Sequence, residues 1–121
     1  MNESTYIDIQ KYKYYKIFAI PCKYLSGELV FFNNHGLNHI LRKNHRDRLF
    51  RDQYRRFELI KYCKDVLYSL DVEVEYRVSH KPNSTAYFWG ITGFVDGKKI
   101  KVVIRRIENG QLIFLSVMDF N

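Results

Sequence analysis

The sequence predicts an α+β domain in which two N-terminal helices pack on a four-stranded antiparallel meander, with an extra N-terminal β-hairpin. Two observations predict this class. The hydrophobic spacing is helical across Asn33–Leu70 and changes to a period of two after Leu70, with clean alternation over Val72–Val78. The dipeptides Asp96–Gly97 and Asn109–Gly110 then separate three apolar runs, and such dipeptides accept the positive φ of tight hairpin turns.

Composition bounds the size and the partners of this domain. The chain has 121 residues, of which 46% are hydrophobic and 17% aromatic, so it can bury one compact core and is too apolar for a disordered chain. Its formal net charge of +7 favours a polyanionic partner, with nucleic acid first and an anionic membrane surface second. A charge that only keeps the protein in solution is the alternative reading.

The two cysteines and the apolar runs indicate a compartment. Cys22 and Cys63 are isolated in sequence, which predicts two buried thiols in a reducing compartment rather than a disulfide. No apolar run approaches the ~18 residues of a membrane span, and the N-terminal segment has no hydrophobic signal core. We therefore expect a soluble, cytoplasmic protein with no membrane partner.

The N-terminal third is the least regular part of the pattern. Met1–Lys16 is polar and rich in tyrosine, and reads either as a frayed terminus or as an edge segment, with a single domain over residues 17–121. Ile17–Tyr24 is a strand candidate in which Pro21 indicates an edge position or a bulge. Leu29–Phe32 is predicted as a short strand that leads into the first helix.

The helical region is basic and contains most of the histidines. Asn33 or Asn34 can cap the first helix, and Asn44–Asp47 is expected to join it to a long second helix over Arg48–Leu70. In that second helix, Arg56 lies at the border of the apolar stripe, where it is either a snorkelling arginine or a functional one. Helical spacing places five basic residues on the polar face of the first helix: His35, His39, Arg42, Lys43 and Arg46.

The C-terminal half is predicted to be sheet. Its strands are Val72–Val78, Ala86–Val95, Lys98–Ile107 and Gln111–Phe120, with a polar loop at Ser79–Thr85. Ile100, Val102 and Ile104 look like core, so Lys101 and Arg105 should lie on the opposite face. Ser116 interrupts an apolar strand, either as a tolerated small polar residue or as a hydrogen-bond donor to a phosphate. Tyr87 and Trp89 share a face, where they either stack bases or are buried.

No metal or cofactor motif is present. His35 and His39 stand four residues apart and could chelate zinc, but a third ligand is not evident and cations crowd the same face. The chain has neither a glycine-rich phosphate loop nor a nucleophile elbow. We therefore expect a metal-free and cofactor-free site.

A histidine among cations is sufficient for metal-free RNA cleavage. One group takes the proton of the 2′-OH, another protonates the departing 5′-oxygen, and cations stabilise the charge on phosphorus, leaving a 2′,3′-cyclic phosphate. His39 is the candidate base or acid, and Arg42 and Lys43 are candidate phosphate ligands. The alternative is that His39 is an ordinary surface histidine.

Three runs of the sequence carry a set of short motifs. They are FFNNHGLNHILRK, RDQYRRFELIKYCKDVL and AYFWGITGFVDGKKIKVVIRRIENGQLIFLSVM. They look like the phage and mobile-element branch of the barnase–EndoU–colicin–RelE superfamily. The resemblance covers roughly residues 30–118 and implies helices followed by a four-stranded antiparallel sheet, with metal-independent RNA cleavage. By match to the motifs it implies catalytic roles for His39, Arg105 and Ser116.

Three classes of function therefore stay open at the level of sequence. The first is a metal-independent endoribonuclease, with RNA as partner and with an inhibitor or antitoxin protein if the enzyme is a toxin. The second is a non-catalytic RNA- or DNA-binding domain that uses the same basic face. The third is an interaction protein whose aromatic residues are covered by a partner. For the first two classes, the residues expected to bind phosphate or RNA are Arg42, Lys43, Arg46, His35, Arg56 and Lys101.

Overall fold

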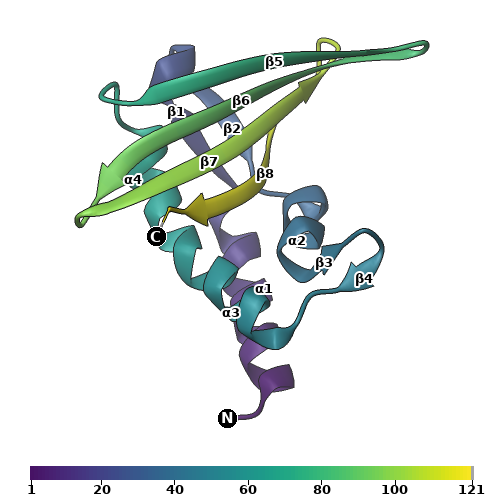
Figure 1. The fold of residues 1–121 in the computed structure, drawn as a ribbon, viewed down its shortest axis with the longest axis vertical. Coiled ribbons are helices and arrows are strands. Elements are labelled where there is room, and N and C mark those ends of the chain that lie inside the picture. Colours follow the sequence, from purple (N-terminus) through teal and green to yellow (C-terminus); the bar gives the residue numbers. More distant parts are fainter. Residues whose placement is uncertain (121) are drawn as a thin grey trace.

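The computed structural model describes residues 1–120 as an α+β fold with helices at the N-terminal side and a sheet built mainly by the C-terminal half (Figure 1). The helices are α1 (Glu3–Ile17), α2 (Asn34–Leu41), α3 (Phe50–Leu59) and α4 (Cys63–Leu67), with single 3₁₀ turns at Lys23–Leu25 and Ile60–Tyr62. The strands are β1 (Ala19–Cys22), β2 (Glu28–Phe31), β3 (Arg42–Lys43), β4 (Arg46–Asp47), β5 (Glu73–Lys81), β6 (Ser84–Val95), β7 (Lys98–Ile107) and β8 (Leu112–Asp119).

The main sheet has six strands in the order β1-β2-β8-β7-β6-β5. Strands β5 to β8 form the predicted antiparallel meander, which is confirmed. The N-terminal hairpin β1–β2 is also present, but it is not a separate addition: β2 pairs in parallel with β8 at Leu112 and Ile113. Pro21 lies in β1, the outermost strand, where a residue without an N–H is tolerated.

Two of the connections differ from the predicted ones. Asp96 and Gly97 both have positive φ and form the expected tight turn. In the last hairpin the positive φ falls on Glu108 instead of on Asn109–Gly110. The polar loop expected at Ser79–Thr85 is also wrong, since β5 and β6 extend into it and leave two residues between them. The β5–β6 hairpin therefore reaches beyond the rest of the sheet (Figure 1).

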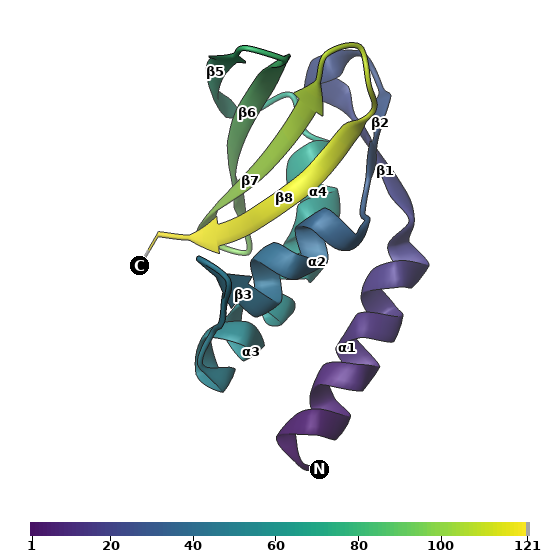
Figure 2. The ribbon, with the colours of Figure 1, turned by 90° about the vertical axis from the view of Figure 1, so that its right-hand side faces the viewer.

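The second predicted helix, Arg48–Leu70, is broken in the structure. It begins at Phe50 and is interrupted by the 3₁₀ turn before α4 ends at Leu67. Phe57 and Cys63, on the two sides of the break, are buried, but Tyr54 and Leu70 are exposed. The predicted apolar stripe is therefore buried only in its middle, and the helix is not continuous. Helix α4 packs against β1, β6 and β7, and α3 against β8; Figure 2 shows α2 beside β8 and α1 farther out.

The prediction for Met1–Lys16 is also corrected, because this segment is neither frayed nor an edge. It forms most of α1, which begins at Glu3 and is capped by Asn2, whose side chain accepts a hydrogen bond from the Thr5 N–H. Tyr14 is 1% exposed, and its hydroxyl donates to the carbonyl of Asn33 at 2.7 Å. The sequence pattern concealed this helix because α1 has no continuous apolar face: Tyr14 is its one buried residue.

The core lies between the sheet and the helices. Ile100, Val102 and Ile104 are fully buried, as predicted. Cys22 and Cys63 are both buried and free, also as predicted. Within residues 1–120, no helix combines the length and the apolar character needed to cross a membrane.

Candidate functional site

The candidate site is organised by α2, which lies directly against β8. The Asn33 side chain caps the helix by accepting from the His35 N–H at 3.1 Å. Gly36 allows the close approach: a Cβ at this position would lie 2.6 Å from the carbonyl oxygen of Phe114 in β8. It would also lie 2.4 Å from the Tyr14 hydroxyl oxygen of α1. Because Leu37 and Ile40 are buried on the inner side, the rotation of α2 about its axis is fixed.

The basic residues after α2 lie on a small β-hairpin and not on the helix. The prediction that Arg42, Lys43 and Arg46 continue the polar face of the helix is therefore wrong. The helix ends at Leu41, and β3 and β4 are joined by Asn44 and His45, both with positive φ. The Arg42 guanidinium donates to the His45 carbonyl oxygen at 2.8 Å and holds this turn closed.

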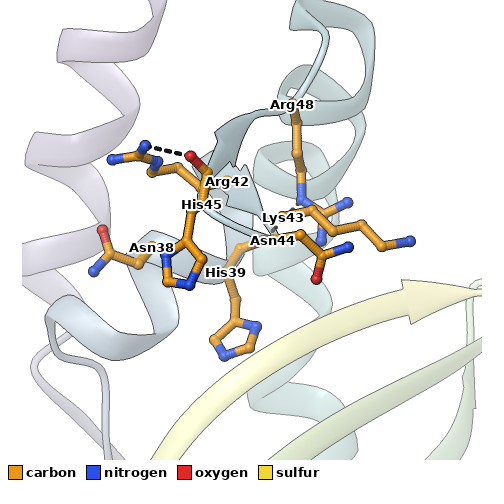
Figure 3. Close-up of a pocket in the computed structure, with 7 residues that line it drawn as sticks. All are labelled: Asn38, His39, Arg42, Lys43, Asn44, His45 and Arg48. Carbon is orange, nitrogen blue, oxygen red and sulfur yellow. Dashed lines mark hydrogen bonds between the residues drawn. The ribbon is translucent and has the colours of Figure 1, made fainter.

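A hollow of about 610 Å³ lies between α2 and this hairpin (Figure 3). Its lining consists of Asn38, His39, Arg42, Lys43, Asn44, His45 and Arg48. The imidazole of His39 extends from α2 toward β8, the yellow strand in Figure 3. Three predicted residues thus meet here: His39, Arg42 and Lys43. The lining includes neither Arg46, which is exposed on β4, nor His35, which is exposed one turn earlier on α2.

The sequence analysis did not identify His45 and Arg48 as site residues. Both lie in the segment that was interpreted as a helix connection and a helix start. The Arg48 Nε donates to the His39 carbonyl oxygen at 2.9 Å, and its Nη1 lies 3.4 Å from the Asp52 carboxylate. Arg48 therefore joins the end of α2 to the start of α3. An Asn-His pair between basic residues was the available signal for a turn, since Asn tolerates positive φ.

The electrostatic surroundings of His39 favour the neutral imidazole. Although the side chain remains accessible to solvent, protein atoms displace part of the water around its ring, and this burial lowers the pKa of His39. The positive charges of Arg105, Arg48 and Arg56, in decreasing order, lower the pKa further. His39 is therefore near arginines from both β7 and α3.

Two of these arginines have no carboxylate partner. Arg56 and Arg105 make no ion pair within residues 1–120, and the Nε of each is buried without a hydrogen-bond partner. Burial lowers the pKa of each guanidinium, because removing water disfavours the charged form. Arg56 also lines a small hollow beside the end of β8, together with Arg55, Asp52 and Asp119. The Asp52 carboxylate partly offsets the lowering of the Arg56 pKa.

The sheet residues of the prediction lie on one face. Arg105 is opposite Ile113, and Val103 is opposite Ser116, with a β-bulge between Val103 and Ile104. Ser116 therefore shares the outer face with Arg105, and its hydroxyl has no hydrogen-bond partner within the described part of the chain. Lys101 lies on this face too, but its Nζ is 3.3 Å from the Glu75 carboxylate and so already has a counter-charge.

Neither a metal-binding cluster in the described residues nor a similarity to a known protein identifies the site. Among residues 1–120, no group of three or more His, Cys, Asp or Glu side chains is arranged to hold a metal ion. Comparisons with protein-family models, with curated proteins and with solved structures each found no match to this chain. The resemblance to the nuclease superfamily therefore stays a prediction.

Proposed function

We propose that this protein is a metal-independent endoribonuclease whose site is built around His39. One observation supports this most: the lowered pKa of the His39 imidazole is due in part to two arginines, Arg56 and Arg105, that make no ion pair within residues 1–120. Elsewhere in the described chain, arginines of similar burial are paired with acids. A site that keeps its histidine neutral and leaves its cations unpaired fits an anionic substrate and a proton transfer.

The arrangement suits transesterification at phosphorus. Neutral His39 accepts the proton of the 2′-OH, the 2′-oxygen forms a bond to phosphorus, and the bond between phosphorus and the 5′-oxygen breaks. Arg56 and Arg105 stabilise the additional negative charge of the pentacoordinate transition state. The departing 5′-oxygen takes a proton from an acid, for which His45 on the same hollow is our candidate. The products are a 2′,3′-cyclic phosphate and a 5′-hydroxyl.

The proposal extends to the type of domain that the helices and the sheet form. We propose that the helices and the meander β5–β8 correspond to a barnase- or RelE-like nuclease domain, as the sequence motifs imply. The parallel strand pair β2–β8 and the helix α1 are then additions to the helices and four-stranded sheet that the motifs imply. If the enzyme is a toxin, a protein inhibitor would have to cover the hollow next to His39.

A non-catalytic RNA- or DNA-binding domain is the second candidate. It is favoured by the net charge of +7 and by the exposed cations Lys43 and Arg46 on the β3–β4 hairpin. Such a domain needs the unpaired arginines but has no use for a neutral imidazole. The proton-transfer role of His39 therefore separates the two candidates.

Incubation of the purified protein with end-labelled single-stranded RNA in excess EDTA tests the proposal. We expect fragments that end in a 2′,3′-cyclic phosphate, identified by mass spectrometry. Salt-sensitive binding without cleavage would instead establish the binding domain, because release of counterions makes affinity fall with salt. If the protein neither binds nor cleaves the RNA, both candidates are contradicted.

A further inference from the structure

The outer face of the sheet holds a row of side chains that includes Arg105, whose charge acts on His39. Register pairs Arg77 of β5 with Phe88 of β6, Phe88 with Arg105 of β7, and Arg105 with Ile113 of β8. Residues paired in this way point to the same side of a sheet, with neighbouring strands about 4.8 Å apart. The row therefore extends about 10 Å from Arg105 to Arg77.

The chemistry of this row is cationic and aromatic. The guanidinium carbon of Arg77 lies 4.1 Å from the centre of the Phe88 ring. Phe88 is half-buried, and neither Arg77 nor Arg105 has a carboxylate partner within residues 1–120. Aromatic rings and guanidinium planes are the two surfaces on which nucleobases stack when a protein binds single-stranded RNA.

The next row on the same face is different. There Gly90 provides no side chain, and Lys101 crosses it to reach Glu75 on β5. A Cβ on residue 90 would lie 2.6 Å from the Lys101 Cε, so the lysine lies flat over the glycine. This row is neutralised by its own ion pair. Of these two rows, only the one that contains Arg105 combines an aromatic ring with cations that have no carboxylate partner within residues 1–120, and the charge of Arg105 acts on His39.

We propose that Phe88 and Arg77 form a subsite for one unpaired nucleobase next to the phosphate that Arg105 binds. This inference rests on the proposed function and specifies its substrate: single-stranded RNA whose base, on one side of the scissile phosphate, is free to stack. In a duplex the bases are already stacked and paired, so the same phosphate could not be presented with a base on Phe88. The subsite recognises a base by its flat face and so tolerates every sequence.

The test uses an eight-nucleotide single strand in which only one nucleotide carries a 2′-OH. Cleavage can then occur only at the phosphate that follows this nucleotide. An abasic nucleotide is placed in turn on each side of that phosphate, and binding is measured by fluorescence anisotropy in the His39→Ala background, where cleavage is suppressed. We expect one abasic position to weaken binding roughly 5- to 140-fold, which is ~1–3 kcal/mol at 1.4 kcal/mol per tenfold change.

The Phe88→Leu substitution should weaken binding of the intact strand by a similar factor. It should cause no further loss when the sensitive position is already abasic, because the two changes remove the same contact. Phe88→Tyr should restore binding, and Phe94→Leu is the matched control. Phe94 lies on the same strand and the same face but is 74% exposed and outside the row. The thermal midpoint of each variant checks that it is folded.

Two outcomes separate this inference from the function on which it rests. If the wild-type protein cleaves the strand while Phe88→Leu binds and cleaves normally, the base subsite is wrong and the nuclease stands. If the wild-type protein never cleaves but the abasic position and Phe88 are coupled in binding, the subsite stands and the nuclease is wrong. Equal losses from Phe88→Leu and Phe94→Leu would also overturn the subsite.

Discussion

The chain contains two Arg-Arg dipeptides, and in each of them the two arginines have different surroundings. In Arg55–Arg56 on α3, Arg55 pairs with Asp119, whereas Arg56 makes no ion pair within residues 1–120, although the Asp52 carboxylate raises its pKa. In Arg105–Arg106 on β7, Arg106 pairs with Glu28, whereas Arg105 makes no ion pair in the described part of the chain. The partnered arginines connect distant segments of the fold. The two unpartnered ones both contribute to the lowered pKa of His39.

This difference separates structural cations from available ones. An arginine whose charge is already balanced by a carboxylate gains less from binding a phosphate, because the carboxylate also repels the anion. A half-buried arginine without a partner gains a counter-charge when an anion arrives. Each dipeptide therefore provides an internal control, in which the same residue type at the adjacent position has the opposite role.

The largest expected effect is on catalysis by His39 itself. His39→Ala should lower the rate of RNA cleavage by roughly 10²–10⁴-fold, the range for loss of a general base or acid. Affinity for RNA should change little, because a neutral imidazole adds no charge to the binding site. Single-turnover rates and anisotropy measure the two quantities, and His35→Ala on the same helix is the control. A drop in affinity with an unchanged rate would contradict the assignment.

Within the β7 dipeptide, neutralising each arginine should produce opposite patterns. Arg105→Gln should weaken RNA binding about tenfold or more and reduce the slope of log affinity against log salt by about 1, with no loss of stability. Arg106→Gln should leave affinity nearly unchanged and lower the free energy of unfolding by about 1 kcal/mol or less, since it breaks a part-exposed ion pair. Urea denaturation and salt titrations measure both. Equal losses of affinity would show that total charge matters and pairing does not.

The position of α2 is the next point to test, because it places His39 among the unpaired arginines. Gly36→Ala should lower the free energy of unfolding by roughly 1–3 kcal/mol, since a Cβ cannot fit between the Phe114 carbonyl and the Tyr14 hydroxyl. Gly27→Ala is the comparison for backbone strain alone, because Gly27 has a φ of +82° and a Cβ there would have no other atom within 4 Å. A stable Gly36→Ala protein with normal cleavage would mean that α2 does not need this close contact.

The smallest expected effect is on the titration of His39. Burial, and after it nearby positive charge, disfavours the imidazolium, so the pKa of His39 is below its ordinary value of about 6.5. Removing a positive charge must raise it: we expect the pKa to rise most in Arg105→Gln, less in Arg48→Gln and least in Arg56→Gln. NMR titration of the ring proton measures this, and the acid limb of kcat/KM should move to higher pH in the same order. Arg51→Gln, on the exposed side of α3, should change neither the pKa of His39 nor the acid limb. If Arg105→Gln leaves the pKa of His39 unchanged, Arg105 does not lie near His39.

The sequence by itself determined the parts of the structure that depend on local pattern. Alternating Val72–Val78 and the tight turn at Asp96–Gly97 predicted the meander, and the cap of α2 was read from Asn33. The burial of Ile104 followed from its place in the strand period, and with it the opposite face for Arg105. Each of these features depends on residues close together in the chain.

Contacts between segments far apart in the chain follow from the tertiary structure and could not be predicted from the sequence. Helix α1, the β3–β4 hairpin and the parallel β2–β8 pair were missed or misread, since each depends on burial against distant segments. The pairing of the arginines follows the same rule: Arg106 finds Glu28 across 78 positions, and Arg55 finds Asp119 across 64. Nothing in an Arg-Arg dipeptide distinguishes its two members. The fold alone supplies one of them with a carboxylate and leaves the other near His39.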